Sequence, residues 1–271
     1  MFEPGASYFA HCPVPISSFA SSISSLGLKF IEIQAEPPFR PADLEDTARR
    51  DLVDLMSSYD LDVRLHGPIY DARLCDLDDG QRLLSVQLAK DCVQLARDLG
   101  SDVLVIHPGK CPGDGGNGVW DTCRARFIES LKEISLLAGD LGVTVAVENK
   151  QRGGDRELIM YPDEHVQILD DMRDYGVMAV LDIGHAHTVG LDLVQYLDLV
   201  KEYLMEVHLH DNVGLRDEHR PLGQGTADIR GFMQSLMRAG YGGAITLELR
   251  SLGAISEALH YLGILPPISI L

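Results

Sequence analysis

Short apolar runs recur along the whole chain, and longer segments with helical spacing of their apolar residues separate them. Runs in the middle of the chain, such as VLVIH ending at His107 and VTVAVE ending at Glu148, are rich in Val, Ile and Leu. Such continuous runs are typical of parallel strands that are covered on both faces. We therefore predict eight strands, at residues 8–11, 29–33, 61–66, 103–107, 143–148, 178–182, from 204 onward, and 244–248.

Amphipathic segments follow each of these runs. In residues 81–99, Leu84, Leu88, Cys92 and Leu95 form an apolar stripe, and Gly100 is a natural helix stop. Further helices are expected at 16–26, 43–59, from the Gly-rich loop 112–118 to 141, and at 162–175, 191–203, 228–239 and 254–262. Without any linker or low-complexity tract, this alternation predicts one domain over residues 1–271, an α/β fold of the (β/α)8 TIM barrel type. A doubly wound open sheet is the alternative, but no Gly-x-Gly-x-x-Gly follows the first strand.

The predicted strands end on metal-ligand residue types. Six consecutive strands finish on or carry such a residue: His66, His107, Glu148, Asp182, His208 and Glu248. His185 follows in the turn after Asp182, and Asp217 and His219 lie in the loop after the seventh strand, where Asp211 and Glu218 add to the density of acidic groups. A single strand-end His or Asp is usually a hydrogen-bonded polar group or a helix cap. Because the carboxyl ends of barrel strands converge at one mouth, the nine residues together predict a metal site.

Other polar residues near the predicted mouth are candidates for substrate contacts. We predict Lys150, His210 and Arg220 as substrate-binding residues, since each could hold a phosphate or hydroxyl. His11 and His187 lie near strand ends and could act in the same way, as could the basic residues Lys110, Arg152, Arg216 and Arg250. His165 and His260 occur in polar helical stretches and are expected on the surface.

Composition limits the classes of function. The 271 residues are 45% hydrophobic, which is enough for a large core, and the net charge of −18 disfavours generic binding to nucleic acid. The five cysteines show no CxxC spacing, so reduced thiols in a cytoplasmic protein are expected, with Cys92 in the core. Neither a signal peptide nor a membrane-spanning run is visible.

At this point the chain resembles the xylose-isomerase-like barrel superfamily, which contains sugar phosphate isomerases and epimerases together with endonuclease IV. The resemblance covers nearly the whole chain. The resemblance rests on these motifs: His66-Gly-Pro, His107-Pro-Gly, Glu148-Asn149, Asp182-Ile-Gly-His185, His208-Leu-His-Asp211, Asp217-Glu-His219, Leu222-Gly-Gln-Gly225 and Glu248.

The ketose epimerase branch of this superfamily implies one divalent metal. It would be held by residues matching Glu148, Asp182, His208 and Glu248. The resemblance further implies that Glu148 and Glu248 are the catalytic acid and base on either side of a sugar or sugar phosphate. The metal would polarise a carbonyl or hydroxyl group of that substrate.

The endonuclease IV branch implies three zinc ions and phosphodiester cleavage. All nine of its ligand positions look filled here, by His66, His107, Glu148, Asp182, His185, His208, Asp217, His219 and Glu248. The sequence nevertheless departs from that enzyme, because Asp-Ile-Gly-His stands where Asp-Thr-Cys-His is usual, and the Gly-x-His-x-Ser opening of the first strand is missing. No run of basic and aromatic residues supplies a DNA-inserting loop.

We therefore favour a metal-dependent sugar or sugar phosphate isomerase or epimerase, with an endonuclease IV-like phosphoester hydrolase as the alternative. One to three divalent ions per chain are expected, with Zn²⁺ favoured by the His-rich ligand set and Mn²⁺, Co²⁺ or Mg²⁺ also suited to a site rich in carboxylates. Nucleic acid is expected as a partner only under the alternative. The sequence leaves open whether the chain forms a homo-oligomer.

Overall fold

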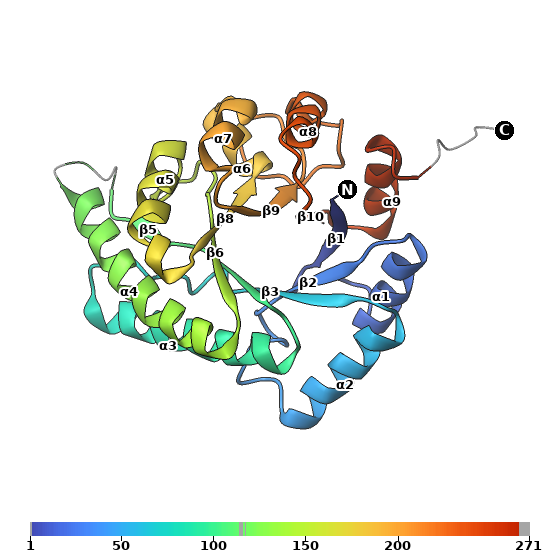
Figure 1. Ribbon diagram of the computed structural model, residues 1–271, viewed down its shortest axis with the longest axis horizontal. Coiled ribbons are helices and arrows are strands. Elements are labelled where there is room, and N and C mark those ends of the chain that lie inside the picture. Colours follow the sequence, from blue (N-terminus) through green and yellow to red (C-terminus); the bar gives the residue numbers. More distant parts are fainter. Residues whose placement is uncertain (1, 114–115, 117, 266–271) are drawn as a thin grey trace.

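A computed structural model describes residues 2–113, 116 and 118–265, so that residues 114, 115 and 117 of the predicted Gly-rich loop lie outside the described residues. Parallel strands form a closed barrel with helices around it (Figure 1), which confirms the predicted (β/α)8 fold. The barrel strands are β1 (Glu3–Tyr8), β2 (Phe30–Gln34), β3 (Asp62–His66), β4 (Val103–Ile106), β6 (Thr144–Glu148), β8 (Met178–Asp182), β9 (Leu204–Leu209) and β10 (Ala244–Leu247).

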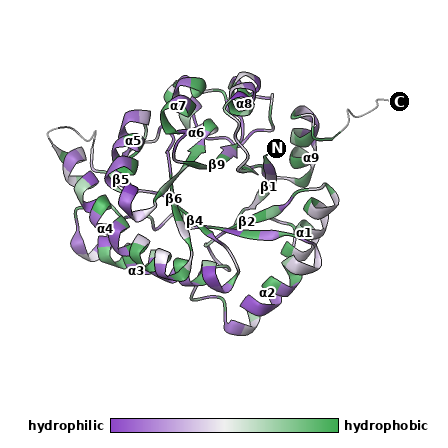
Figure 2. Ribbon diagram, in the orientation of Figure 1, coloured by the Kyte–Doolittle hydropathy of each residue, from purple (hydrophilic) through white to green (hydrophobic). Residues whose placement is uncertain are grey.

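Helices connect successive barrel strands and cover the outside of the barrel. They are α1 (Ile16–Ser25), α2 (Asp46–Ser58), α3 (Asp79–Asp98), α4 (Val119–Leu141), α5 (Pro162–Asp171) with the 3₁₀ turn η1 (Arg173–Tyr175), α6 (Ile183–Val189), α7 (Leu193–Val200), α8 (Ile229–Arg238) and α9 (Leu252–Tyr261). Apolar residues of these helices pack on outward-facing strand residues such as Ile31 and Ile33, which forms the main core. Figure 2 shows hydrophobic segments along the strands and polar patches on the outer helices.

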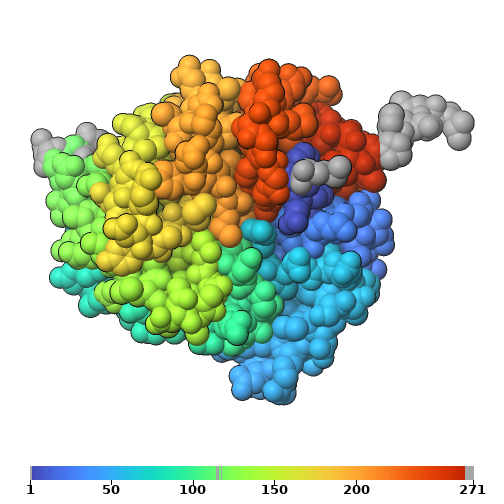
Figure 3. All heavy atoms as spheres, viewed as in Figure 1, coloured from blue at the N-terminus to red at the C-terminus, as the bar shows by residue number. Residues whose placement is uncertain are grey.

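Pairing of the first strand with the last closes the barrel. Gly5 lies in register with Thr246 of β10 on one side and with Phe30 of β2 on the other. A Cβ atom at Gly5 would lie 2.3 Å from the Phe30 ring, so this inward-facing position requires glycine. In the space-filling view the blue N-terminal segment accordingly lies against the red C-terminal segment (Figure 3).

Three local predictions were wrong or incomplete. The first strand is Glu3–Tyr8 rather than 8–11, because its backbone pairs with β10 and β2 there, and residues 10 and 11 form a turn. Helix α6 was not predicted; the Asp182 side chain begins it by accepting a hydrogen bond from the His185 backbone N–H. A small antiparallel sheet of β5 (Lys110–Cys111) and β7 (Arg156–Glu157), which joins two mouth loops, was also missed.

The cysteines agree with the expectation of unpaired thiols. All five cysteines are free, and Cys92 is fully buried in the core. Among the described residues, no helix is long and apolar enough to cross a membrane.

His165 was predicted on the surface, and this is wrong, because its side chain is fully buried. Its Nε2 lies 3.0 Å from the carbonyl oxygen of Val147, and its Nδ1 lies 3.2 Å from the hydroxyl of Tyr196. A neutral imidazole satisfies both contacts, since one nitrogen donates and the other accepts. The pKa of His165 is lowered to about 4, mainly because burial disfavours the charged imidazolium. His260, by contrast, is partly exposed on α9.

We expect His165 to make folding sensitive to acid. The pKa of His165 is 6.5 in the unfolded chain and about 4 in the folded protein. As the pH falls, the unfolded chain therefore takes up a proton at this residue before the folded protein does. The associated stability is fully present above pH 6.5 and is lost as the pH falls toward 4. The loss is on the order of 3 kcal/mol at 1.36 kcal/mol per pKa unit.

Urea unfolding of the wild type and of His165→Gln across this pH range tests the expectation. The free energy of unfolding of the wild type should fall more steeply with acid than that of the variant. A difference between the two proteins that stays constant with pH would contradict the prediction.

Candidate metal centre and pocket

Alternation along the barrel strands explains why the predicted ligands meet. Side chains two residues apart on a strand face the same side, so His66, Glu148 and Asp182 continue the inward-facing sets of β3, β6 and β8. His208 lies on the inward face of β9, and Glu248 directly follows β10. These five side chains are all buried.

His208 lies at the centre of the Glu, Asp, His, Glu set. Its Nδ1 is 3.8 Å from Oε1 of Glu148 and 3.5 Å from Oε1 of Glu248. Ligand atoms of Glu148, Asp182 and His208 all lie within 4.8 Å of one another. Nδ1 of His208 is buried and has no hydrogen-bond partner. A buried polar atom without a partner, surrounded by carboxylates, fits a divalent cation.

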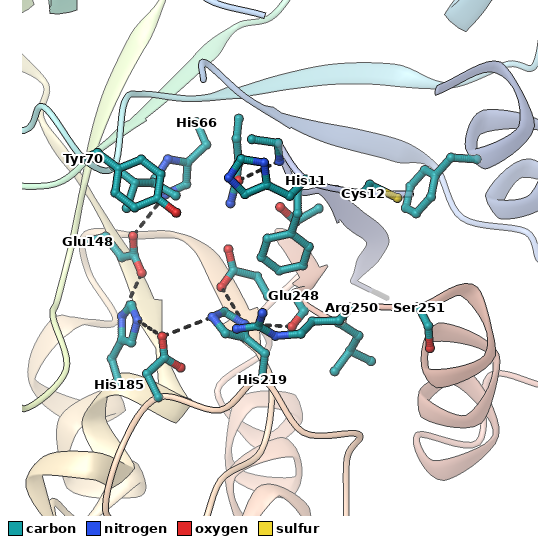
Figure 4. Close-up of a pocket in the computed structure, with 18 of the residues that line it drawn as sticks. His11, Cys12, His66, Tyr70, Glu148, His185, His219, Glu248, Arg250 and Ser251 are labelled. Carbon is teal, nitrogen blue, oxygen red and sulfur yellow. Dashed lines mark hydrogen bonds and ion pairs between the residues drawn. The ribbon is translucent and has the colours of Figure 1, made fainter. Parts of the chain in front are cut away.

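A second group lies on the other side of Glu148. Oε2 of Glu148 is 3.2 Å from Nε2 of His66 and 2.6 Å from Nε2 of His107. The ammonium of Lys150, which is also buried, lies 2.9 Å from the same His107 nitrogen. Figure 4 shows His66 and Glu148 joined in this way on the pocket wall.

A third group gathers around Asp217. Its Oδ2 atom is 3.5 Å from Nε2 of His185 and 3.1 Å from Nε2 of His219. His210 lies among these residues, with Nε2 3.2 Å from the Asp182 carboxylate and its ring stacked on that of His219 at 4.1 Å. His219 adopts a left-handed backbone with φ of 49°, a strained conformation that is typical of functional sites. The structure therefore brings all nine predicted ligands together, with His210 among them.

Burial and neighbouring charges shift the pKa values of these groups. Burial alone would raise the pKa of Glu148, but Lys150, His107 and His185 outweigh it and hold that pKa well below its usual range. Burial and then Lys150 lower the pKa of His107 to about 3. For His208, burial lowers the pKa, but carboxylates including Glu32 and Glu248 outweigh it and raise the pKa well above normal. The mouth thus concentrates carboxylates around imidazoles, which is the electrostatic setting that attracts a cation.

A cavity of about 460 Å³ opens above these groups, within the usual size of a small-molecule site. Its walls include His11, Cys12 and Tyr70 beside the carboxylates (Figure 4). Phe9 is a further lining residue. Lys150 and Arg250 also line it.

Several other predicted substrate contacts point elsewhere. The guanidinium of Arg220 pairs with Glu218 at 2.9 Å, and Arg220 is outside the cavity lining, so its role as a substrate contact stays a prediction. His187 bonds to Thr226, and Arg216 is exposed next to Glu218.

Comparison with known proteins places this arrangement in a family. Residues 21–263 match the family described as xylose isomerase-like TIM barrel. The chain belongs to this family. Over 74% of its length it is 30% identical to an uncharacterized protein of Methanocaldococcus jannaschii, of which the match covers 69%.

Two further relatives of the xylose isomerase-like family represent different activities. The fructoselysine 3-epimerase of Shigella flexneri is 23% identical over 88% of this chain and 87% of its own length. A probable endonuclease 4 of Clostridium beijerinckii is 25% identical over 61% of this chain and 62% of its own length. Among solved structures, a D-tagatose 3-epimerase-like protein superposes with a TM-score of 0.86 and 24% identity, covering 97% of this chain and 96% of that one.

Beneath the mouth of this xylose isomerase-like barrel lies a polar layer that sequence analysis missed. Glu32, Arg64, Glu206 and Thr246 each stand two residues before an inward-facing residue at a strand end. Arg64 pairs with Glu206 at 2.9 Å, and Glu206 accepts a hydrogen bond from Thr246. Glu32 lies 3.3 Å from Nε2 of His208, opposite the Nδ1 that faces the site. We name these four residues the barrel floor.

The spacing itself could have indicated the floor. A charged residue in mid-strand, two positions before a predicted ligand, must share the ligand's face. The floor therefore sits directly below the site, and it brings the carboxylates of Glu32 and Glu206 to 3.3 and 3.6 Å from Nε2 of His208. Carboxylates commonly orient metal-binding histidines from such positions.

Asp211, which sequence analysis counted among the acidic residues of the metal-rich stretch, has a structural role instead. Its fully buried carboxylate accepts hydrogen bonds from four backbone N–H groups. They belong to Asn212, Gly223, Gly225 and Ala227. Asp211 therefore ties down the loop that carries Asp217 and His219.

Proposed function

We propose that the chain is a metal-dependent sugar epimerase or isomerase. The observation that carries the proposal is the approach of two glutamates, Glu148 and Glu248, to the unpartnered Nδ1 of His208 at the base of the cavity. A divalent cation held there by Glu148, Asp182, His208 and Glu248 would supply Lewis-acid polarisation of a substrate carbonyl or hydroxyl.

The two glutamates would move the proton. Glu148 ends β6 and Glu248 directly follows β10, and both line the cavity. One carboxylate can remove the hydrogen next to the carbonyl group, and the other can return it from another direction, which inverts the carbon. His66, His107 and Lys150 line the same cavity and can donate hydrogen bonds to substrate oxygens.

The related proteins support this chemistry. Both the fructoselysine 3-epimerase and the D-tagatose 3-epimerase-like protein carry names of sugar epimerases, and the match covers most of each. We propose a small ketose or ketose phosphate as the substrate.

Solvent exchange tests the proposal. Protein stripped by a chelator and reloaded with Mn²⁺, Co²⁺ or Zn²⁺ would be incubated in D2O with a panel of ketoses and ketose phosphates. We expect deuterium to enter the carbon next to the carbonyl, together with the epimer, only after metal is restored; NMR and chromatography detect both. No exchange with any ketose, together with cleavage of an abasic-site oligonucleotide, would reject the epimerase.

A phosphoester hydrolase of endonuclease IV type is the second candidate. The assembly of all nine predicted ligands around one mouth favours it, as does the similarity to a probable endonuclease 4. The net charge of −18 opposes it, since the protein field repels a polyanion.

A further inference from the structure

Lys150 lies beside the group of His66, His107 and Glu148, which would have to bind a metal ion if the mouth held several ions. It follows β6 by two residues, and its side chain is buried beside the group formed by His66, His107 and Glu148. Its Nζ is 2.9 Å from Nε2 of His107, the nitrogen that also faces Glu148 at 2.6 Å. This is the His107 atom that points to the group's common centre.

One imidazole nitrogen cannot serve two cations. Neutral imidazole offers a single lone pair at its acceptor nitrogen, and metal binding requires that lone pair. In the tautomer in which Nε2 carries that lone pair, the Lys150 ammonium can donate a hydrogen bond to it. The ammonium has no lone pair of its own to offer a metal. A positive charge at this distance also repels a dication that approaches the same nitrogen.

The neighbouring group is different. Among the described residues, no lysine or arginine forms an ion pair with Asp182 or contacts Nδ1 of His208. The ligand atoms of Glu148, Asp182 and His208 lie within 4.8 Å of one another, and the side chains that contact their carboxylates there are imidazoles. The two halves of the mouth therefore offer a metal very different surroundings, although both are rich in ligands.

We propose that Lys150 closes the His66–His107–Glu148 group to metal. The divalent ion is then confined to the rest of the mouth, and the chain binds one ion fewer than its nine ligands could hold. His66 and His107 then form part of the cavity wall and hold no metal. The proposal deepens the proposed function and rests on it only in assuming a divalent metal at the mouth.

Counting bound zinc in matched variants tests this proposal without any turnover assay. Metal-free wild type, Lys150→Met and Lys110→Met would be dialysed against ZnCl2 and analysed for zinc per chain. Lys110→Met removes the same charge from a nearby side chain that is 58% exposed and 3.9 Å from Glu157. We expect Lys150→Met to bind one more zinc per chain than the wild type, and Lys110→Met to match the wild type.

Two further variants locate the extra ion. Adding His107→Ala to Lys150→Met should return the count to that of the wild type, and Lys150→Arg, which keeps the cation, should not raise it. Circular dichroism and thermal unfolding confirm that each protein is folded. Equal counts in the wild type and Lys150→Met would overturn the proposal.

A single substitution covers the case in which Lys150→Met does not fold. His107→Ala in the wild-type background should leave the zinc count and affinity unchanged if no metal binds to that histidine. A loss of one zinc per chain would show that the group is open and would overturn the proposal. A lack of epimerase activity would contradict the proposed function, whereas the number of zinc ions per chain tests only the role of Lys150.

Discussion

Replacing Glu248 with Gln is expected to lower kcat/KM for epimerisation by roughly 1,000-fold, within the usual range for loss of a general acid or base. The amide cannot carry the proton that the carboxylate transfers, and it is a weaker ligand. Glu148→Gln should show a similar loss. Because each variant keeps one carboxylate, deuterium exchange from D2O should survive with only one of the two epimers, and with opposite epimers in the two variants. NMR of the recovered sugars measures this.

Glu257→Gln is the matched control, because Glu257 is exposed on α9 and away from the cavity lining. It should retain wild-type rates. Equal exchange of both epimers in Glu248→Gln would show that this carboxylate does not move the proton.

Asp211→Asn is expected to destabilise the protein and weaken its metal site together. An amide can accept through only one of its two terminal atoms, so two of the four backbone N–H groups would face an N–H donor. Each unsatisfied buried donor costs about 1–3 kcal/mol, so the two together give a loss of about 2–6 kcal/mol in the free energy of unfolding. Since the loop carries Asp217 and His219, zinc affinity should fall as well. Urea unfolding and zinc titration measure the two effects.

Asp228→Asn provides the comparison. Asp228 is exposed and caps α8 by accepting a hydrogen bond from Gly231, a role that asparagine fills equally well. Its unfolding free energy should stay within about 0.5 kcal/mol of the wild type, as for most surface changes. If Asp211→Asn lost no more unfolding free energy than Asp228→Asn, the loop that carries Asp217 and His219 would be held by contacts other than those of Asp211.

The sequence predicts the barrel, and it predicts that the nine candidate ligands lie at one mouth, because both follow from strand periodicity. His66, His107, Glu148 and Asp182 stand at the ends of predicted strands, so their convergence follows from the barrel fold. No such periodicity marks β1, whose EPGASY sequence contains Pro4 and Gly5 and becomes a strand through pairing with β2 and β10.

Long-range contacts explain the other failures. The β5–β7 pair joins residues about 46 positions apart in two loops, and neither partner has a local pattern. His165 lies in a polar helical sequence, and only Val147 and Tyr196, which come from other elements, show why its ring turns inward. Lys150 could be placed at the mouth by sequence, but its approach to His107 depends on the β6 loop conformation.

The barrel floor has a consequence for engineering this protein. Comparable layers in barrels are commonly filled by Val, Ile and Leu, whereas here two carboxylates and a guanidinium occupy the interior. Exchanging buried ionic groups for well-packed apolar ones of similar volume often raises stability. A search for thermostable variants would therefore select changes at Glu32, Arg64 and Glu206. Those changes would remove the carboxylates that lie 3.3 and 3.6 Å from Nε2 of His208. Stability and activity are in conflict at this layer, so libraries for thermostability should hold these three positions fixed.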